Sequence, residues 1–415
     1  MIRVLDTTGR GVAQSPSAAS QRDMRRHNLA AVLRTVAAHG PLSRAAVADH
    51  TGLTRAAVSS LVDQLRADGL VAEVGRAPSG RVGRPGTALA VNERGPAGLG
   101  LEIGVSHLGA CVVDLRGEVR VWLHRDTGNR GRDAAEVLAE LSALAGRAID
   151  RAGAEGLRPV AAVLSVPGVV GADPGVLEHA PNLGWRQVAV AGAVPSRGVP
   201  LRAENEANLG ALAEVWTGSP GPDVLHVSAE AGIGAALVIG GRLFRGARGF
   251  AGELGHVPVH PSGPPCGCGA RGCLERYAGL EAVRTRAGLA PDAADGDVVA
   301  ALAARAREGD ARTRGALGRA ATALGTALTG AVNLMDPATV VLGGAYAELA
   351  PWLLPGMRRE LAARVTVRPW RDGQLTVSVL GRRGPLLGAA LSTVRRIVED
   401  PVAAAPEGGW AGLRG

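Results

Sequence analysis

The stretch GELGHVPVHPSGPPCGCGARGCLE, Gly252 to Glu275, places three of the chain's four cysteines within eight residues. Cys266, Cys268 and Cys273 follow His256 closely, and together the four residues offer the soft and borderline ligands that tetrahedral zinc prefers. The glycines among the cysteines let so short a loop turn back on itself. Because four protein ligands leave no coordination position open, we expect structural zinc and not a hydrolytic metal.

Two other uses of these cysteines are less favourable. A Cys266–Cys268 disulfide would be strained and disfavoured in a reducing compartment, and thiol chemistry would not need a third cysteine. Cys111, the fourth cysteine, lies in an apolar stretch and is most simply a core residue.

The wider composition predicts a soluble, cytoplasmic protein without a membrane partner. The 415 residues are 46% hydrophobic, which suffices for two or three domains, and no apolar run reaches the length that spans a bilayer. The first residues, MIRVLDTTGRGVAQSPSAASQRDMRR, lack the apolar core of a secretory signal. We therefore expect reducing surroundings and no structural disulfide.

The formal net charge of +8 is distributed unevenly along the chain. All basic residues are arginines and none is lysine, which is typical of codon bias and weakens the total charge as an indication of nucleic-acid binding. Residues 1–95, however, hold 13 arginines against 7 acidic residues. Such an excess is expected if the N-terminal part contacts phosphates.

The periodicity of the same region predicts a helix-turn-helix. Apolar residues recur at helical spacing from Arg25 until the HGP sequence at residues 39–41, and Ser43 can cap a short second helix that runs through Asp49. After a turn at Gly52, Thr54 caps a third helix, whose expected buried stripe consists of Val58, Leu61, Val62 and Leu65.

The opposite face of the third helix carries short or hydrogen-bonding side chains, so its backbone can approach a major groove. Two strands, residues 70–75 and 87–92, follow and predict a hairpin wing whose arginines could enter a minor groove. An ordinary three-helix bundle, and a mobile loop with incidental arginines, are the alternatives. The candidate DNA contacts are Ser43, Thr54, Arg55, Ala56, Ser59, Ser60, Arg81 and Arg84.

Beyond a junction at residues 92–100, strand and helix patterns alternate. Three strands, a helix and a further strand are expected between residues 98 and 168, and residues 224–246 repeat the three-strand arrangement. The sequence GACVV from Gly109 matches GAALV from Gly234. This duplication predicts a two-lobed α/β domain with a cleft between its halves.

Two segments supply polar side chains for such a cleft. Glu204, Asn205, Glu206 and Asn208 stand at the start of a predicted helix, where plain helix capping is the alternative use of these side chains. The FAGELGH segment, residues 250–256, adds a second acid and an imidazole. Together they form a set of donors and acceptors suited to a polyhydroxylated ligand.

These motifs together resemble the ROK family of repressors, open reading frames and kinases. The resemblance extends from about Arg25 to Glu399, and GELGH followed by CGCGARGCLE is its most specific part. It implies an α/β fold in which a winged helix-turn-helix precedes a two-lobed sugar-kinase domain of the actin and hexokinase type. The implied parts are a disordered segment 1–24, a DNA-binding domain 25–94, a ROK domain 97–398 with its zinc loop at 256–273, and a disordered tail 399–415.

The resemblance also implies roles for particular residues. Zinc would be held by His256, Cys266, Cys268 and Cys273, with the second ring nitrogen of His256 left for a sugar hydroxyl. The sugar pocket would consist of Asn205, Glu206, Glu253, His256 and Glu275.

Family kinases need an aspartate base at position 206 and glycine loops for ATP, and this chain departs from that pattern. Glu206 replaces the aspartate, and the two loops read EIGVSH at residues 102–107 and EAGIG at residues 230–234. VVLGGAY, residues 340–346, keeps the glycines of an adenosine-side loop, which inherited fold geometry alone would explain.

These departures favour a repressor that binds a sugar or sugar phosphate without phosphorylating it. Because helix-turn-helix proteins usually bind two-fold half-sites, we expect it to bind operator DNA as a homodimer or a dimer of dimers. The alternatives are an active sugar kinase with a DNA-binding module and, less favoured, a DNA-binding protein that no longer senses a ligand.

Overall fold

The structure is a computed structural model that describes residues 18–76, 87–171, 173–192, 198–218, 220–290 and 295–404. The chain divides into two compact units. One unit is Met1–Asn92 with Arg396–Gly415, and the other is Glu93–Arg395. Within the described residues, no helix is both long enough and apolar enough to cross a membrane.

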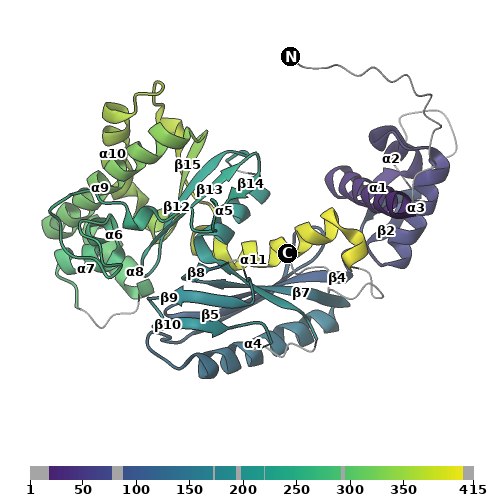
Figure 1. Ribbon diagram of the computed structural model, residues 1–415, viewed down its shortest axis with the longest axis horizontal. Coiled ribbons are helices and arrows are strands. Elements are labelled where there is room, and N and C mark those ends of the chain that lie inside the picture. The colour runs from purple at the N-terminus through teal and green to yellow at the C-terminus, as the bar shows by residue number, and fades with distance from the viewer. Residues whose placement is uncertain are drawn as a thin grey trace, which may run out of the picture. The chain divides into compact units, whose positions relative to one another are not determined.

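The N-terminal unit contains a winged helix, in which α1, α2 and α3 lie together (Figure 1). Its antiparallel sheet has the order β1-β3-β2. The predicted helix-turn-helix and hairpin strands are present, and the expected stripe of α3 is buried. The elements are α1 Ala18–His39, β1 Leu42–Ser43, α2 Arg44–Thr51, α3 Arg55–Ala67, β2 Val71–Arg76 and β3 Thr87–Val91.

Two helix ends differ from the sequence expectation. Helix α1 begins at Ala18, seven residues before Arg25, so residues 18–24 are helical and not disordered. These residues have no apolar stripe, but alanine, glutamine, arginine and methionine are strong helix formers. Helix α2 runs two residues past Asp49 to Thr51, and its C-cap is Gly52, which adopts the left-handed conformation with φ 71°.

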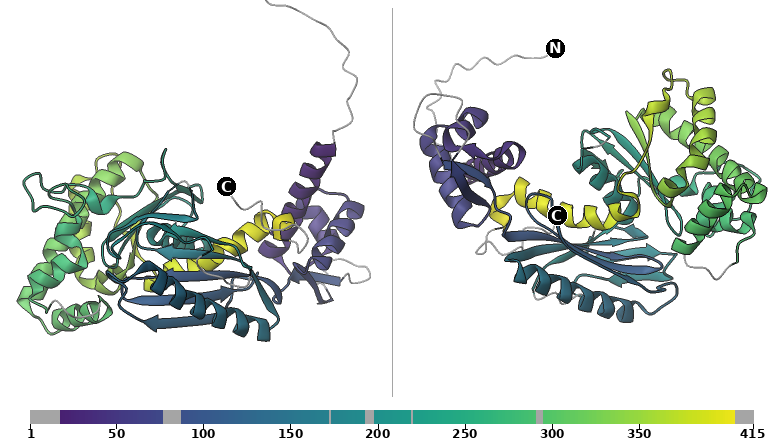
Figure 2. Two further views of the ribbon diagram at one scale, coloured as in Figure 1. Left: turned by 60° about the horizontal axis from the view of Figure 1, so that its bottom comes forward. Right: turned by 180° about the vertical axis from the view of Figure 1, so that it is seen from behind.

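The first half of the large unit is a five-stranded sheet in the order β11-β7-β4-β5-β6. Helix α4, Ala134–Ala154, packs on one face of this sheet. Helix α11 runs from Gly384 to Glu399, and its first part packs on the other face (Figures 1 and 2). The strands are β4 Gly95–Ile103, β5 His107–Val113, β6 Val119–Asp126, β7 Leu157–Val166 and β11 Leu201–Asn205.

The second half repeats this plan with a sheet in the order β14-β13-β12-β15-β16. Both halves begin with three antiparallel strands, and the matching sequences from Gly109 and Gly234 lie in the middle strand of each trio. The duplication predicted from the sequence is therefore a duplication of sheet topology. The strands are β12 Val224–Ala229, β13 Ile233–Ile239, β14 Arg242–Phe244, β15 Thr339–Gly344 and β16 Leu375–Val377.

Helices cover the second sheet on both faces, with α10 on one and α5 on the other (Figure 1). Its main core is built from valine, leucine and alanine side chains of the sheet and of α7 to α10. The helices are α5 Glu206–Trp216, α6 Glu275–Ala278, α7 Leu280–Ala287, α8 Asp295–Arg307, α9 Ala311–Met335 and α10 Ala345–Arg364.

Short elements complete the chain. A separate sheet in the order β10-β9-β8 is formed by β8 Val169–Val170, β9 Val176–Ala180 and β10 Trp185–Ala189. The 3-10 helices are η1 Leu254–His256, η2 Asp372–Gln374, η3 Gly381–Arg383 and η4 Pro401–Ala404.

The C-terminal end also differs from the expectation of a disordered tail from residue 399. Glu399 is the last residue of α11, and η4 packs on α1 within the N-terminal unit. There, Arg26 Nε donates to Asp400 Oδ1 over 2.7 Å. This long-range contact has no local signal in the sequence.

Candidate functional site

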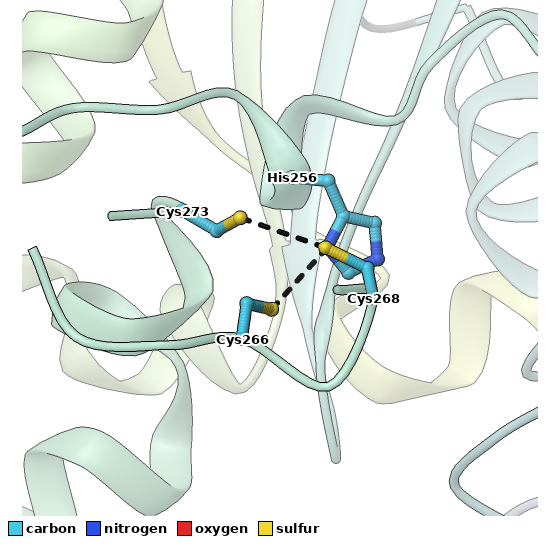
Figure 3. Close-up of side chains that lie close together, drawn as sticks. All are labelled: His256, Cys266, Cys268 and Cys273. Carbon is cyan, nitrogen blue, oxygen red and sulfur yellow. Dashed lines mark hydrogen bonds between the residues drawn. The ribbon is translucent and has the colours of Figure 1, made fainter. Parts of the chain in front are cut away.

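The cysteine-rich loop brings its three thiols to one histidine, as Figure 3 shows. His256 ends η1, and the loop of Cys266 to Cys273 folds against it just before α6. Backbone hydrogen bonds close the loop: Cys266 N donates to Ala270 O over 2.8 Å, and Gly269 N donates to Cys266 O over 3.0 Å. The four ligand atoms all lie within 4.8 Å of one another.

The separations within this cluster fit a tetrahedral metal ion. His256 Nδ1 lies 3.8 Å from Cys266 Sγ, and Cys268 Sγ lies 3.7 Å from Cys273 Sγ. Metal–sulfur bonds of about 2.3 Å in a tetrahedron place neighbouring sulfurs roughly 3.8 Å apart. The cluster could therefore hold a metal through all four residues.

Without a cation, the surroundings of Cys273 disfavour its thiolate form. Burial and the neighbouring thiols of Cys268 and Cys266 raise the pKa of Cys273 to about 12. A divalent ion reverses this effect, because it stabilises the thiolate form of each ligand.

His256 directs its two ring nitrogens to different groups. Nδ1 faces the cysteines, while Nε2 lies 3.9 Å from Glu253 Oε2, which is too long for a hydrogen bond. The ring is half-buried and Glu253 is exposed. The geometry leaves Nε2 available to a ligand.

Asn205 is the N-cap of α5, which was the alternative use considered for this segment. Its Oδ1 accepts from Ala207 N over 2.9 Å and from Asn208 N over 3.2 Å, and its Nδ2 donates to Gly168 O over 2.9 Å. The amide is thus held rigidly, and one hydrogen on Nδ2 remains for another acceptor.

Glu204 stabilises this cap through hydrogen bonds. The carboxylate is buried and accepts from Asn205 N over 2.9 Å and from Asn208 Nδ2 over 2.8 Å. Arg245, which follows β14, pairs with its second oxygen. Burial alone would raise the pKa of Glu204, but the hydrogen bond and charge of Arg245 bring it below its ordinary value.

The Glu204–Arg245 pair connects the Asn205 segment to the segment that leads to Glu253. Sequence analysis singled out Glu204 but not Arg245, which lies 41 residues away. A buried acid needs a partner, but the sequence offers many arginines that could serve. Only the position of β14 selects Arg245.

Glu275, two residues after Cys273, connects the cysteine-rich loop to the turn between β12 and β13 through a hydrogen bond. Its Oε2 accepts from Ile233 N over 3.3 Å. A side chain at Gly232 would place its Cβ only 2.6 Å from the same oxygen and 3.3 Å from Asn182 Nδ2. Asn182 thus borders the candidate site, and nothing in the sequence analysis identified it.

Glycines in the loops at residues 102–107 and 340–346 also lie beside other side chains of this protein. The ring of His107 lies against Gly104, where an added Cβ would approach Cε1 to 2.2 Å. The Glu230 carboxylate lies against Gly344, with 3.1 Å to an added Cβ, and accepts from Arg382 Nη2 over 2.9 Å. A side chain of the protein therefore lies beside each of these two glycines.

Glu206 lies among other acidic residues. It is half-buried at the first position of α5, and burial together with the charges of Glu230 and Glu102 raises its pKa to about 8. Glu102 Oε2 in turn lies 3.4 Å from His107 Nε2. At neutral pH the Glu206 carboxyl group is mostly protonated and can donate a hydrogen bond.

In the N-terminal unit, the candidate DNA contacts divide into caps and exposed side chains. Ser43 Oγ accepts from Ala46 N, and Thr54 Oγ1 accepts from Ala57 N, each over 3.2 Å, so both hydroxyls cap helices. Arg55, Ala56 and Ser60 are exposed on α3, and Ser59 is half-buried. Arg81 and Arg84 lie outside the described residues.

Comparisons with known proteins agree with this arrangement. The ROK family model matches residues 98–395, and the MarR family model matches residues 30–82. The xylose repressor of Bacillus subtilis (strain 168) is 29% identical over 89% of this chain and 95% of its own length.

Two solved structures share the fold. A ROK family transcriptional regulator, described as a homolog of the E. coli MLC protein, covers 91% of this chain and 97% of its own with a TM-score of 0.75 at 23% identity. A ROK family glucokinase from Streptomyces griseus, in complex with glucose and AMPPNP, covers 71% of this chain and 98% of its own with a TM-score of 0.61 at 27% identity. The regulator extends over both units, whereas the kinase matches a shorter part.

Proposed function

The chain belongs to the ROK family, and we propose that it is a DNA-binding repressor of carbohydrate-metabolism genes that senses a sugar or sugar phosphate without phosphorylating it. The observation that carries this proposal is the presence of a winged helix and a ROK domain in one chain. The similarity to a xylose repressor along 89% of the chain supports it.

The cluster of His256 and the three cysteines is proposed to bind one structural zinc ion. Zinc suits three thiolates and one imidazole in a tetrahedral arrangement, and the distances of 3.7 and 3.8 Å support that assignment. The ion would hold the His256 ring so that Nε2 is presented to the ligand.

Five residues are proposed to contact the sugar. They combine hydrogen-bond acceptors and donors, and two of them are fixed by hydrogen bonds, Asn205 as the cap of α5 and Glu275 through Ile233 N. The sugar-binding residues are Asn205, Glu206, Glu253, His256 and Glu275.

Loss of kinase activity is supported by the loops that would receive a nucleotide. Backbone amides bind phosphates only when the phosphates can approach closely, and here the ring of His107 lies beside Gly104 and the Glu230 carboxylate lies beside Gly344. The carboxylate of Glu230 would also repel the phosphates of ATP.

The DNA contact is proposed to centre on the exposed start of α3. Thr54, Arg55, Ala56, Ser59 and Ser60 would face the major groove, and Ser43 would face the phosphates. Arg81 and Arg84 would reach the minor groove. Because helix-turn-helix proteins usually bind palindromic half-sites as two-fold dimers, we propose that the protein binds its operator as a homodimer or a dimer of dimers. We propose the cytoplasm as its location.

The proposal is tested by titrating a panel of sugars into a complex of the full chain with DNA from its own upstream region. We expect one sugar class to change the operator affinity at least tenfold. No effect of any sugar would leave a DNA-binding protein that does not sense a ligand, and would overturn the proposal.

An active sugar kinase is the second candidate, and the glucokinase fold match is the observation that favours it. A coupled assay of ADP release with hexoses, pentoses and amino sugars separates the two. Robust turnover would contradict the non-catalytic assignment.

A further inference from the structure

We propose that α11 passes the sugar signal from the ROK domain to the DNA-binding unit, and that Gly388 is the positioning residue through which α11 receives it. This inference rests on the proposed function, because it concerns a repressor whose operator affinity changes when a sugar binds. It assigns a role in coupling to a helix that contributes no residue to either proposed binding site.

Helix α11 has residues in both compact units. It runs without interruption from Gly384 to Glu399, and the division between the units falls within it, after Arg395. Its last residues are part of the DNA-binding unit, in which η4 follows α11 and packs on α1. Because an unbroken helix is a rigid element, a displacement of its first turns can be carried along its axis.

The first turns of α11 lie directly on the backbone of β4, where two glycines leave room for them. A Cβ added at Gly98 would lie 2.2 Å from Ala390 O, and one added at Gly100 would lie 2.5 Å from Leu386 O. Carbon atoms in favourable contact stay about 3.5–4.0 Å apart, so neither position accepts a side chain without movement of α11. The helix and the first sheet are therefore packed backbone to backbone.

Gly388 makes the same kind of close contact with α5. A Cβ added at Gly388 would lie 2.1 Å from Leu209 O and 3.3 Å from Leu209 Cα. Gly384, one turn earlier on α11, lies beside the next residue of α5, since its added Cβ would be 3.6 Å from Gly210 Cα. Helix α11 is therefore in backbone contact with α5 as well as with β4.

The contact at Leu209 lies in the first turns of α5, close to the proposed sugar residues. Asn205 is the N-cap of α5 and Glu206 is its first residue, so Leu209 follows them within the same helix. A ligand that shifts Asn205 and Glu206 would shift the Leu209 carbonyl as well, because hydrogen bonds tie each helical turn to the next. No side chain of Gly388 stands between that carbonyl and the backbone of α11, so the displacement would reach α11 directly.

The other end of α11 is connected to the DNA-binding helices. Asp400, directly after α11, donates from its backbone N to Arg396 O over 2.8 Å, and its Oδ1 accepts from Arg26 Nε over 2.7 Å. Arg26 lies on α1, and α1 packs on α3, which carries the exposed Arg55. The contacts therefore form a continuous series from α5 through α11 and α1 to α3.

The test measures sugar affinity and sugar response separately on the full chain. Isothermal titration calorimetry with glucose, xylose, N-acetylglucosamine and their phosphates gives the affinity, and fluorescence anisotropy with labelled operator gives the response to the ligand that binds. Gly388→Ala adds the Cβ for which Leu209 O leaves no room. We expect its sugar affinity to stay within about threefold of wild type, and its sugar-dependent change in operator affinity to fall roughly fivefold or more.

Gly330→Ala is the matched control for the change at Gly388. Gly330 also lies within a helix, α9, but a Cβ added there has no atom within 4 Å outside its own turn of helix. Both substitutions raise helix propensity equally, so only the contact with Leu209 distinguishes them. Gly330→Ala should leave both sugar affinity and sugar response unchanged.

A second variant tests the other end of α11 and decides the matter if Gly388→Ala does not fold. Asp400→Asn removes the charged partner of Arg26, and the sugar response should fall roughly threefold while sugar affinity stays unchanged. Glu399→Gln is its control, because it removes the same charge at the neighbouring exposed residue and leaves Asp400 in place.

The outcomes separate this inference from the proposed function. If no ligand changes the operator affinity of the wild-type chain, the proposed function itself fails. If wild type responds and folded Gly388→Ala responds equally, or loses affinity and response together, the coupling role of Gly388 is overturned. A normal response in Asp400→Asn overturns the transmission through α11.

Discussion

The DNA-binding unit and the ROK domain place their candidate functional residues in different ways. In the first, the described candidates lie within 18 residues, from Ser43 to Ser60, and two of them cap helices. In the second, the residues come from distant segments that are joined by hydrogen bonds. Glu204 accepts a hydrogen bond from Arg245, and Glu275 accepts one from Ile233 N in the turn between β12 and β13.

Because of this difference, substitutions in the two regions should change different numbers of properties. A residue held by a local cap acts largely alone, so its loss should affect one property by a modest amount. A residue held by a remote segment also supports its partner, so its loss should disturb both stability and ligand response. The following substitutions test this contrast between the two regions.

The largest effect is expected at the metal cluster. Cys268→Ser removes one of the four proposed ligands, and the loop should lose most of the proposed zinc and, with it, the orientation of His256. The operator complex should then no longer respond to sugar. Metal analysis of the purified protein and fluorescence anisotropy with labelled operator measure the two losses.

The control for the metal cluster is Cys111→Ser, the same change at a buried cysteine outside the cluster. It should leave the zinc content intact. Full zinc content and a normal sugar response in Cys268→Ser would contradict the metal assignment.

The next effect is expected at the pair that joins two sugar-site segments. Arg245→Ala leaves the buried Glu204 carboxylate without its cation, and should lower the free energy of unfolding by about 1–2 kcal/mol after allowance for the exposure of Arg245. Sugar affinity should fall as well. Urea denaturation and calorimetry measure these changes, and Arg248→Ala, at an exposed arginine three residues on, is the control.

The effect at Arg245 should depend on pH. Because Arg245 lowers the pKa of Glu204, the pair stabilises the fold above the ordinary pKa of a glutamate, and this contribution is lost as pH falls through the lowered pKa. The difference between wild type and Arg245→Ala should therefore shrink in acid. A constant difference would mean that Arg245 acts through packing and not through charge.

A smaller effect, confined to DNA binding, is expected on α3. Arg55→Ala should weaken operator binding roughly tenfold, or about 1.4 kcal/mol, and leave zinc content and sugar affinity unchanged. Arg66→Ala is the control on the same helix, because Arg66 is near Asp63 and Glu73. Equal losses in both variants would indicate a general charge effect and not a specific contact.

The smallest effect is expected at a helix cap. Thr54→Ala removes the hydroxyl that accepts from Ala57 N and should cost about 1 kcal/mol of stability in the N-terminal unit. Thr54→Ser retains the hydroxyl and should restore most of it. Thermal unfolding followed by circular dichroism measures the difference, and a loss of DNA affinity beyond the loss of stability would assign Thr54 a direct contact.

The winged helix and the duplicated sheets could be predicted because their signals are local. Apolar spacing marks α3, and strand patterns between glycine turns mark both three-strand units. The start of α1 was placed too late, because residues 18–24 form a helix without an apolar stripe. The contact of Asp400 with Arg26 joins residues 374 positions apart and left no local pattern.

The sequence by itself identified the four candidate metal ligands, since all four lie within 18 residues of one segment whose glycines permit the turn. Only the tertiary structure decided that Arg245 pairs with Glu204, that Glu275 holds the turn at Ile233, and that His107 and Glu230 lie beside glycines. These contacts depend on strand register and on the packing of helices onto the two sheets. A chain with many arginines and glutamates offers numerous possible pairs, and the fold selects among them by distance.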